Sequence, residues 1–247
     1  MASQDRQLYE AGDATNPTLI LLHGLGLGNW MWQPQLPLFA DGYHVLAPRL
    51  FGTDGAHPFT LEDAATTLAD LIHAQNHGHA HICGISLGAI TALQLYQQAP
   101  ETIASLTLSG CQIHPHPLLM GVQELLMRIL PEQQLVSSVP AFFRKQYPEY
   151  VELGVAEGRL MGKKGLIHAA GAVGRIDFRR LLPTITVPTL VLCGGNDRLN
   201  LPAARQLSTN IPHAQLRIVP GVGHIWNLEQ PETFAHIVLE FLHQTIS

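Results

Sequence analysis

A chain of 247 residues with 46% hydrophobic and 13% charged side chains can form one large globular domain with a small insertion, and this composition excludes intrinsic disorder. The net charge of −5, with no basic stripe, argues against nucleic acid and anionic membranes as partners. The first residues are polar, no apolar run approaches the roughly 18 to 20 residues of a membrane span, and the three cysteines lie in or near apolar stretches. We therefore expect a cytoplasmic protein without disulfides.

Short apolar runs alternate with helical patterns in the first and last thirds of the chain. This alternation predicts a mostly parallel sheet with helices on both faces. Strands are expected at 7–10, 18–22, 43–47, from 80 into a glycine-rich turn, 103–108, 187–193 and 215–219. Helices are expected at 29–40, 60–75, from 87 to the proline at 100, 201–209 and 228–244.

The pattern changes between residues 113 and 182. Apolar residues recur there at helical spacing, proline and glycine interrupt them, and no strand-like run is visible. We interpret residues 113–182 as a cap of three or four helices. It is inserted into an α/β core formed by residues 1–112 and 183–247.

A Gly-x-Ser-x-Gly turn, made of Gly84, Ser86 and Gly88, joins an apolar strand to a helix. A serine at such a corner has a strained backbone and presents its hydroxyl at the sheet edge, while glycines on either side avoid a collision across the turn. The first N–H groups of the helix would face negative charge that develops nearby. The pattern predicts that Ser86 is a nucleophile; the alternative is a glycine-rich turn with an incidental serine.

A serine hydroxyl is a weak nucleophile at neutral pH and needs a base. His224 follows a late strand in a glycine-bearing loop, and Asp197 follows the preceding strand. A carboxylate at that place can accept the imidazole N–H and stabilise the imidazolium. All three residues come at the carboxyl ends of strands, where open α/β sheets carry their sites. Alternatively, His224 is one of 14 unremarkable histidines and Asp197 only caps its own turn.

The oxyanion formed by attack on a carbonyl needs hydrogen-bond donors. The backbone N–H of Leu87, directly after the nucleophile, is one candidate, and that of Leu25, in the loop after the first long strand, is the second. The alternative for the His23-Gly24-Leu25 segment is a plain glycine turn.

No cofactor motif and no metal site are expected. His77, His79 and His81 alternate, but the first two flank a glycine, and no cysteine or carboxylate cluster is near them in the sequence.

Several motifs resemble the α/β-hydrolase superfamily, in its small capped branch. The similar segments are 22–24, 59–63, 84–88, 185–197 and 223–224. Within the superfamily, the short cap and the elbow around Ser86 look most like 3-oxoadipate enol-lactonases and related carboxylesterases. The resemblance implies an α/β-hydrolase fold, a Ser86-His224-Asp197 triad and Gly-x-Ser-x-Gly as the nucleophile elbow. Because the elbow carries serine rather than aspartate, haloalkane dehalogenase and epoxide hydrolase chemistry are disfavoured.

One loop departs from the family pattern. Many relatives carry Asp-x-Arg-Gly after the second long strand, whereas here Arg49 stands at the position of the acid and Phe51 at that of the arginine. The departure puts in question the ion-paired brace of that loop and any substrate carried over from relatives that have it.

The sequence therefore predicts a serine hydrolase that cleaves a small carboxylic ester, lactone or thioester through an acyl-enzyme. The alternatives are a receptor-like ligand-binding protein with little turnover, or a C–C bond hydrolase or perhydrolase that uses the same triad. The pocket is expected between elbow and cap, with apolar wall candidates that could equally be ordinary packing: Trp30, Met31, Leu118, Leu119 and Met120.

Overall fold

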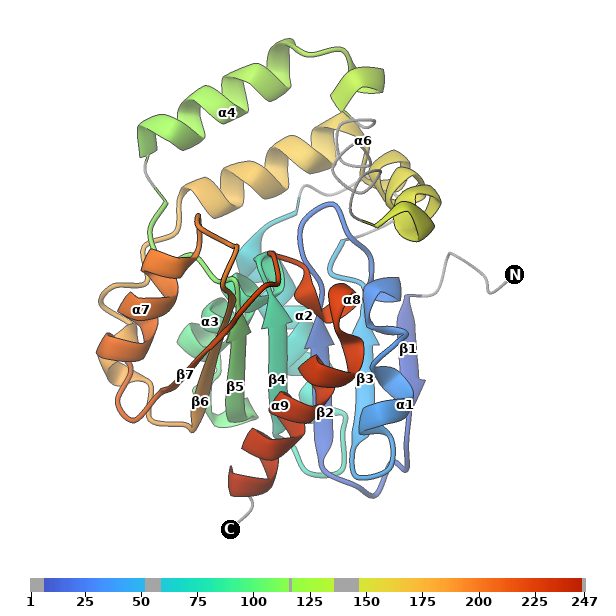
Figure 1. Ribbon diagram of the computed structural model, residues 1–247, viewed down its shortest axis with the longest axis vertical. Coiled ribbons are helices and arrows are strands. Elements are labelled where there is room, and N and C mark those ends of the chain that lie inside the picture. Colours follow the sequence, from blue (N-terminus) through green and yellow to red (C-terminus); the bar gives the residue numbers. More distant parts are fainter. Residues whose placement is uncertain (1–6, 52–58, 116, 136–146, 246–247) are drawn as a thin grey trace.

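The computed structural model of the chain describes residues 7–51, 59–115, 117–135 and 147–245 (Figure 1). Its centre is a seven-stranded sheet with the order β1-β3-β2-β4-β5-β6-β7. Only β1 is antiparallel to its neighbour, so the prediction of a mostly parallel sheet is confirmed. The strands are β1 (Leu8–Ala11), β2 (Thr18–Leu22), β3 (His44–Pro48), β4 (Ala80–Ile85), β5 (Ile103–Ser109), β6 (Thr189–Gly194) and β7 (Gln215–Val219).

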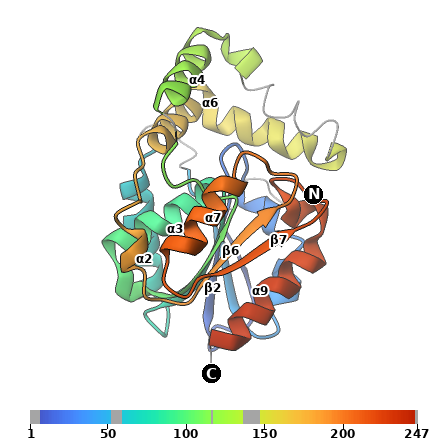
Figure 2. The ribbon, with the colours of Figure 1, turned by 60° about the vertical axis from the view of Figure 1, so that its left-hand side comes forward.

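Helices cover both faces of the sheet, as Figure 2 shows with α2, α3 and α7 on one side and α9 on the other. Alternate side chains of β2 face the two layers: Leu19 and Leu21 pack with one apolar cluster, and Ile20 and Leu22 with the other. Strands buried on both faces in this way read as continuous apolar runs. The helices of this part of the chain are η1 (Asn29–Trp32), α1 (Leu36–Phe39), α2 (Leu61–His73), α3 (Leu87–Gln98), η2 (Pro100–Thr102), η4 (Leu182–Thr184), α7 (Leu201–Asn210), α8 (Trp226–Glu229) and α9 (Pro231–Thr245).

Helices α4 and α6, in the segment 113–182 that is called the cap below, lie over the carboxyl ends of the central strands (Figure 1). Its described helices are α4 (Pro117–Ile129), η3 (Pro148–Tyr150) and α6 (Val151–Gly174). Helix α6 is kinked at Gly162, where φ is 59° and ψ is 177°. The amine of the next residue, Lys163, donates hydrogen bonds to the carbonyls of Arg128 and Leu130, so the kink holds the end of α4. None of the helices in the described ranges has both the length and the apolar character needed to cross a bilayer.

Two predicted helices are broken by proline. The single helix expected at 29–40 is wrong: η1 and α1 replace it because Pro34 lacks the N–H that a continuous helix needs. The expected closing helix is likewise divided into α8 and α9. Gln230 is not helical there, with φ −139° and ψ 69°, because the ring of Pro231 disfavours a helical conformation in the residue before it.

Two glycines allow the start of α3 to lie against the sheet. A Cβ atom at Gly88 would come within 2.1 Å of the Leu22 carbonyl oxygen, and one at Gly84 within 2.4 Å of the Gly88 carbonyl carbon. These approaches fix the corner between β4 and α3 beside the end of β2.

We predict that Gly88→Ala lowers the free energy of unfolding by about 1–3 kcal/mol or prevents folding, because the backbone of β2 must move to admit the methyl group. Urea unfolding measures the change. The matched control is Gly121→Ala in α4, where a Cβ has no neighbour within 4 Å, and where the better helix former should add about 0.5–1 kcal/mol. Equal stability of the Gly88→Ala protein and the wild type would contradict the close approach.

Candidate active site

Ser86 occupies the corner between β4 and α3 with φ 55° and ψ −115°, a conformation that non-glycine residues rarely adopt. Its backbone N–H donates a 2.8 Å hydrogen bond to the carbonyl of Ser109 at the end of β5. Helix α3 begins at Leu87, so the serine precedes the first free N–H groups of a twelve-residue helix. The side chain is half-buried. The observed strain is what the Gly-x-Ser-x-Gly pattern predicts for a serine presented at a sheet edge.

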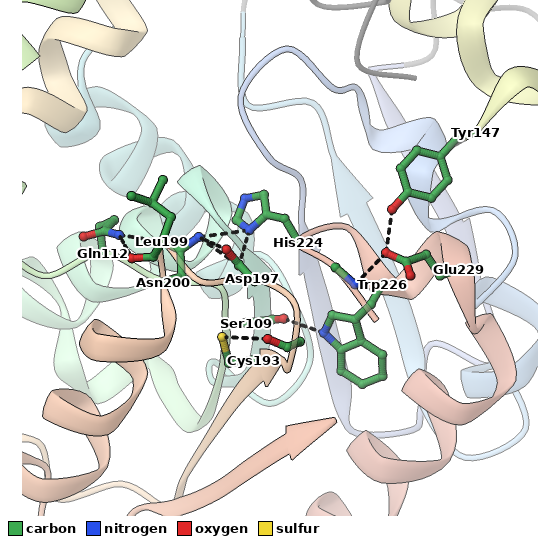
Figure 3. A network of polar contacts seen from close by, with 12 residues as sticks. Ser109, Gln112, Tyr147, Cys193, Asp197, Leu199, Asn200, His224, Trp226 and Glu229 are labelled. Atoms are coloured by element: carbon green, nitrogen blue, oxygen red, sulfur yellow. Dashed lines mark hydrogen bonds and ion pairs between the residues drawn. The ribbon is translucent and has the colours of Figure 1, made fainter. Parts of the chain in front are cut away.

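Asp197 and His224 meet above the ends of β6 and β7. His224 Nδ1 lies 2.6 Å from Asp197 Oδ2, and the two side chains are 29% and 6% exposed (Figure 3). An ionised carboxylate only accepts hydrogen bonds, so the imidazole donates its proton from Nδ1. This leaves Nε2 unprotonated, which is the form that a general base requires.

A third residue, Asn200, completes the polar cluster and was not found from the sequence. Its amide Nδ2 donates to both oxygens of Asp197, at 2.9 and 2.8 Å, and its Oδ1 accepts from Gln112 Nε2 at 2.6 Å. Burial alone would raise the pKa of Asp197, but the hydrogen bonds from His224 and Asn200 outweigh it and lower the pKa. The carboxylate is therefore ionised at neutral pH.

One short backbone segment links the serine to the histidine. Ser109 accepts the N–H of Ser86, and a Cβ atom at Gly110 would lie 2.8 Å from both Nδ1 and Cε1 of His224. The imidazole therefore lies against the residue that directly follows the partner of Ser86. Within the described ranges no hydrogen bond joins the hydroxyl of Ser86 to His224. Such bonds are commonly long without substrate and shorten in the complex.

The loop after β2 lies beside the serine. A Cβ atom at Gly24 would be 3.5 Å from the Cβ of Ser86. In the part of the chain that is described, the N–H groups of Leu25 and Leu87 donate to no protein acceptor. A developing oxyanion needs two free donors near the nucleophile, and these two N–H groups are the candidates.

His23 holds this loop in place from within the protein. It is fully buried and accepts the Leu50 N–H at Nε2, 2.9 Å away. Nε2 is thus unprotonated, so Nδ1 carries the proton and donates it to the Gly24 carbonyl at 3.0 Å. Burial, with the nearby charge of Arg49, lowers the pKa of His23 from 6.5 to about 4, so the ring is neutral above that pH.

The unusual loop after β3 forms an ion pair with the cap. The guanidinium of Arg49 donates to the carboxylate of Glu157 in α6, and only 2% of either side chain is exposed. Burial raises the pKa of Glu157, and Arg49 opposes this rise. In many relatives an ion pair within this loop is expected from Asp-x-Arg-Gly. Here the arginine at the position of the acid pairs instead with a cap residue.

A cavity of about 1120 Å³ opens between α2, the residues after β3 and the second half of α6. On the core side it is lined by residues that include Arg49, Leu50 and Phe51. On the cap side the lining residues include Met161, Lys164 and His168. Ser86 and His224 are not among its lining residues.

Trp30, Met31 and Met120, three of the expected pocket walls, do not line this cavity. Trp30 stacks on Tyr150 with ring centroids 5.7 Å apart, Met31 is fully buried in the core, and Met120 packs over Gly174. The side chains of Leu118 and Leu119 lie outside the described residues.

In the described ranges no three His, Cys, Asp or Glu side chains are placed to hold a metal ion. The rings of His77 and His79 are 6.2 Å apart, and His81 is buried, with its Nδ1 2.8 Å from the hydroxyl of Ser105. Cys83, Cys111 and Cys193 are buried free thiols, and burial raises the pKa of each; they are inert packing residues, as expected.

Comparisons with known proteins agree on a class for the chain. Residues 19–237 match the Alpha/beta hydrolase family. The sequence is 30% identical to a Yersinia enterocolitica protein named carbamate hydrolase RutD, over 91% of this chain and 87% of that protein. It is 26% identical to 3-oxoadipate enol-lactonase 1 of Acinetobacter baylyi, over 94% and 90%. A solved hydrolase from Pseudomonas aeruginosa PA01 has a TM-score of 0.84 and 26% identity, over 95% and 93%.

We predict that His23 makes stability depend on pH. Its pKa is about 4 in the folded protein, against the ordinary value of 6.5 in the unfolded chain, so between these values the unfolded chain binds more protons. The contribution of His23 to the free energy of unfolding is therefore at its maximum above about pH 6.5, and it is lost as the pH drops towards about 4. At about 1.4 kcal/mol per pKa unit, His23 accounts for roughly 3 kcal/mol of this loss.

The test is urea unfolding of the wild type and of His23→Gln, whose side chain cannot titrate, over a range of about three pH units from roughly 7.5 to 4.5. The loss should shrink by roughly 2–3 kcal/mol, and a remainder from His81, whose pKa is also about 4, should persist. His73→Gln, at an exposed position, is the matched control. If the free energy of unfolding falls equally with pH in the wild type and in His23→Gln, the lowered pKa of His23 is contradicted.

Proposed function

We propose that this chain, which belongs to the alpha/beta hydrolase family, is a serine hydrolase that cleaves a small carboxylic ester, lactone or thioester through an acyl-enzyme. The observation that carries the proposal is the 2.6 Å hydrogen bond between His224 and Asp197 beside the strained corner at Ser86. Membership of the family supports hydrolysis as the class of reaction, and the side chains support serine as the nucleophile.

The reaction begins when His224 Nε2 takes the proton of the Ser86 hydroxyl as the oxygen attacks the substrate carbonyl. The carbonyl oxygen becomes an oxyanion, which the N–H groups of Leu25 and Leu87 stabilise. As the tetrahedral intermediate collapses, the alcohol or thiol leaves with the proton from His224. Water then attacks the acyl-enzyme with the same base, and Ser86 regains its proton when the acid product leaves.

Asp197 and Asn200 act on this sequence through His224. The carboxylate keeps the imidazole proton on Nδ1 and stabilises the imidazolium that forms during each attack. The Asn200 amide holds both carboxylate oxygens, and thereby the direction in which the carboxylate faces the ring.

A carbamate is the second candidate substrate, because a relative 30% identical over 91% of the chain carries that activity in its name. The same nucleophile and oxyanion donors would attack a carbamate carbonyl. The difference is the leaving group, since His224 would protonate an amine or an alkoxide according to which bond is cleaved.

We predict that Ser86→Ala lowers kcat/KM for the best substrate by about a thousandfold or more, because the nucleophile is lost while the fold is kept. The substrates to compare are p-nitrophenyl esters of increasing chain length, lactones, acyl thioesters and an aryl carbamate. Ser208→Ala in α7 is the matched control and should retain full turnover, and both variants should melt near the wild-type temperature. Near wild-type turnover by the Ser86→Ala protein, with contaminating esterase excluded, would refute the assignment.

A further inference from the structure

We propose that the buried ion pair between Arg49 and Glu157 is a positioning device for the loop after β2, residues 23–28, called the oxyanion loop because it carries the N–H of Leu25. Through this pair, the seating of the cap on the core sets the direction of that N–H. This inference rests on the proposed hydrolase function. Arg49 and Glu157 are positioning residues and not catalytic ones, because neither takes part in a step of the proposed reaction.

The pair joins two parts of the chain that are 108 residues apart. Arg49 directly follows β3 in the core, and Glu157 lies in the first half of α6 in the cap. With 2% of each side chain exposed, both charges are removed from water, and the contact between them offsets part of the cost of burying them. The ion pair therefore links the position of α6 in the cap to that of Arg49 in the core.

The carboxylate also touches the oxyanion loop itself. A Cβ atom at Gly28 would lie 2.3 Å from Oε2 of Glu157 and 2.9 Å from its Cδ. Glu157 thus rests on the backbone at the far end of the loop that begins at His23. A larger residue at position 28 would push the carboxylate from this place.

A chain of hydrogen bonds continues from Arg49 to the oxyanion donor. The residue after Arg49, Leu50, donates its N–H to His23 Nε2 at 2.9 Å, and His23 Nδ1 donates to the Gly24 carbonyl at 3.0 Å. That carbonyl belongs to the same planar peptide group as the N–H of Leu25. Fixing the direction of one therefore fixes the opposite direction of the other.

A purely structural role would be served at least as well by apolar side chains. Replacing a buried ion pair with hydrophobic residues of similar volume is often neutral or stabilising, whereas removing one partner is strongly destabilising. A directional contact has a different consequence, because guanidinium and carboxylate lock one geometry and an apolar pair does not. This difference separates positioning from stability in an experiment.

The experiment compares the wild type with the double variant Arg49→Met/Glu157→Leu, which removes both charges and keeps much of the apolar volume. The substrate is the best p-nitrophenyl ester, and the second probe is an alkyl trifluoromethyl ketone, whose carbonyl adds Ser86 to give a stable oxyanion. Glu124→Gln is the matched control, since it also removes a cap glutamate paired with an arginine, but at a partly exposed site.

We expect the double variant to melt near the wild-type temperature with KM within about twofold. Its kcat should fall by about ten- to a hundredfold, a part of what the loss of one oxyanion donor costs. The affinity for the trifluoromethyl ketone should fall by the same factor, which a merely structural change would not produce. Glu124→Gln should change neither value. If the double variant does not fold, Glu157→Gln, assayed well below its melting temperature, supplies the same two readouts.

A folded variant with wild-type kcat and wild-type affinity for the ketone would overturn the proposal and leave the hydrolase function intact. A rise in KM that matches the loss of affinity for the ketone, with kcat unchanged, would also overturn the proposal, because it indicates a damaged pocket. A wild-type protein that neither turns over esters nor binds the ketone would refute the proposed function and this inference together.

Discussion

The hydrogen bond between His224 and Asp197 is the contact on which the account of this site depends. It joins the turns that follow β6 and β7, two strands that are neighbours in the sheet but whose ends belong to separate loops. The glycine at 110 lets the imidazole lie against the backbone, and the preceding residue, Ser109, holds the corner at Ser86. The end of β5 therefore contacts both the corner that carries Ser86 and the ring of His224.

The cap is tied to this sheet edge by polar contacts as well as by packing. Beside the pair of Arg49 and Glu157, the hydroxyl of Tyr147 donates to Glu229 at 2.6 Å, and Glu229 accepts the N–H of Gly223, next to the histidine, at 2.9 Å (Figure 3). The first tie links the cap to the residue after β3, and its Glu157 also lies against Gly28 in the loop that carries the proposed oxyanion donor. The second tie ends at the loop that carries the proposed base.

Much of this arrangement could be predicted from the sequence because it follows from local pattern. Each of the seven strands in the described residues overlaps a predicted one, and motifs spread along the chain identified the hydrolase family, which the comparisons confirm. The ion pair of Arg49 and Glu157 could not be predicted, because the partners are far apart and only the folded cap brings them together. The role of Asn200 was missed for another reason: a single asparagine three residues after an aspartate is indistinguishable from an ordinary turn residue.

The central claim is that Ser86 is an armed nucleophile, and covalent labelling tests it most directly. The protein is incubated with an alkyl fluorophosphonate, and the modified residue is located by peptide mass spectrometry. The account predicts one adduct, on Ser86, that forms far more slowly when His224 is replaced by glutamine. No adduct, an adduct on another residue, or labelling at an unchanged rate in the His224→Gln protein would contradict it.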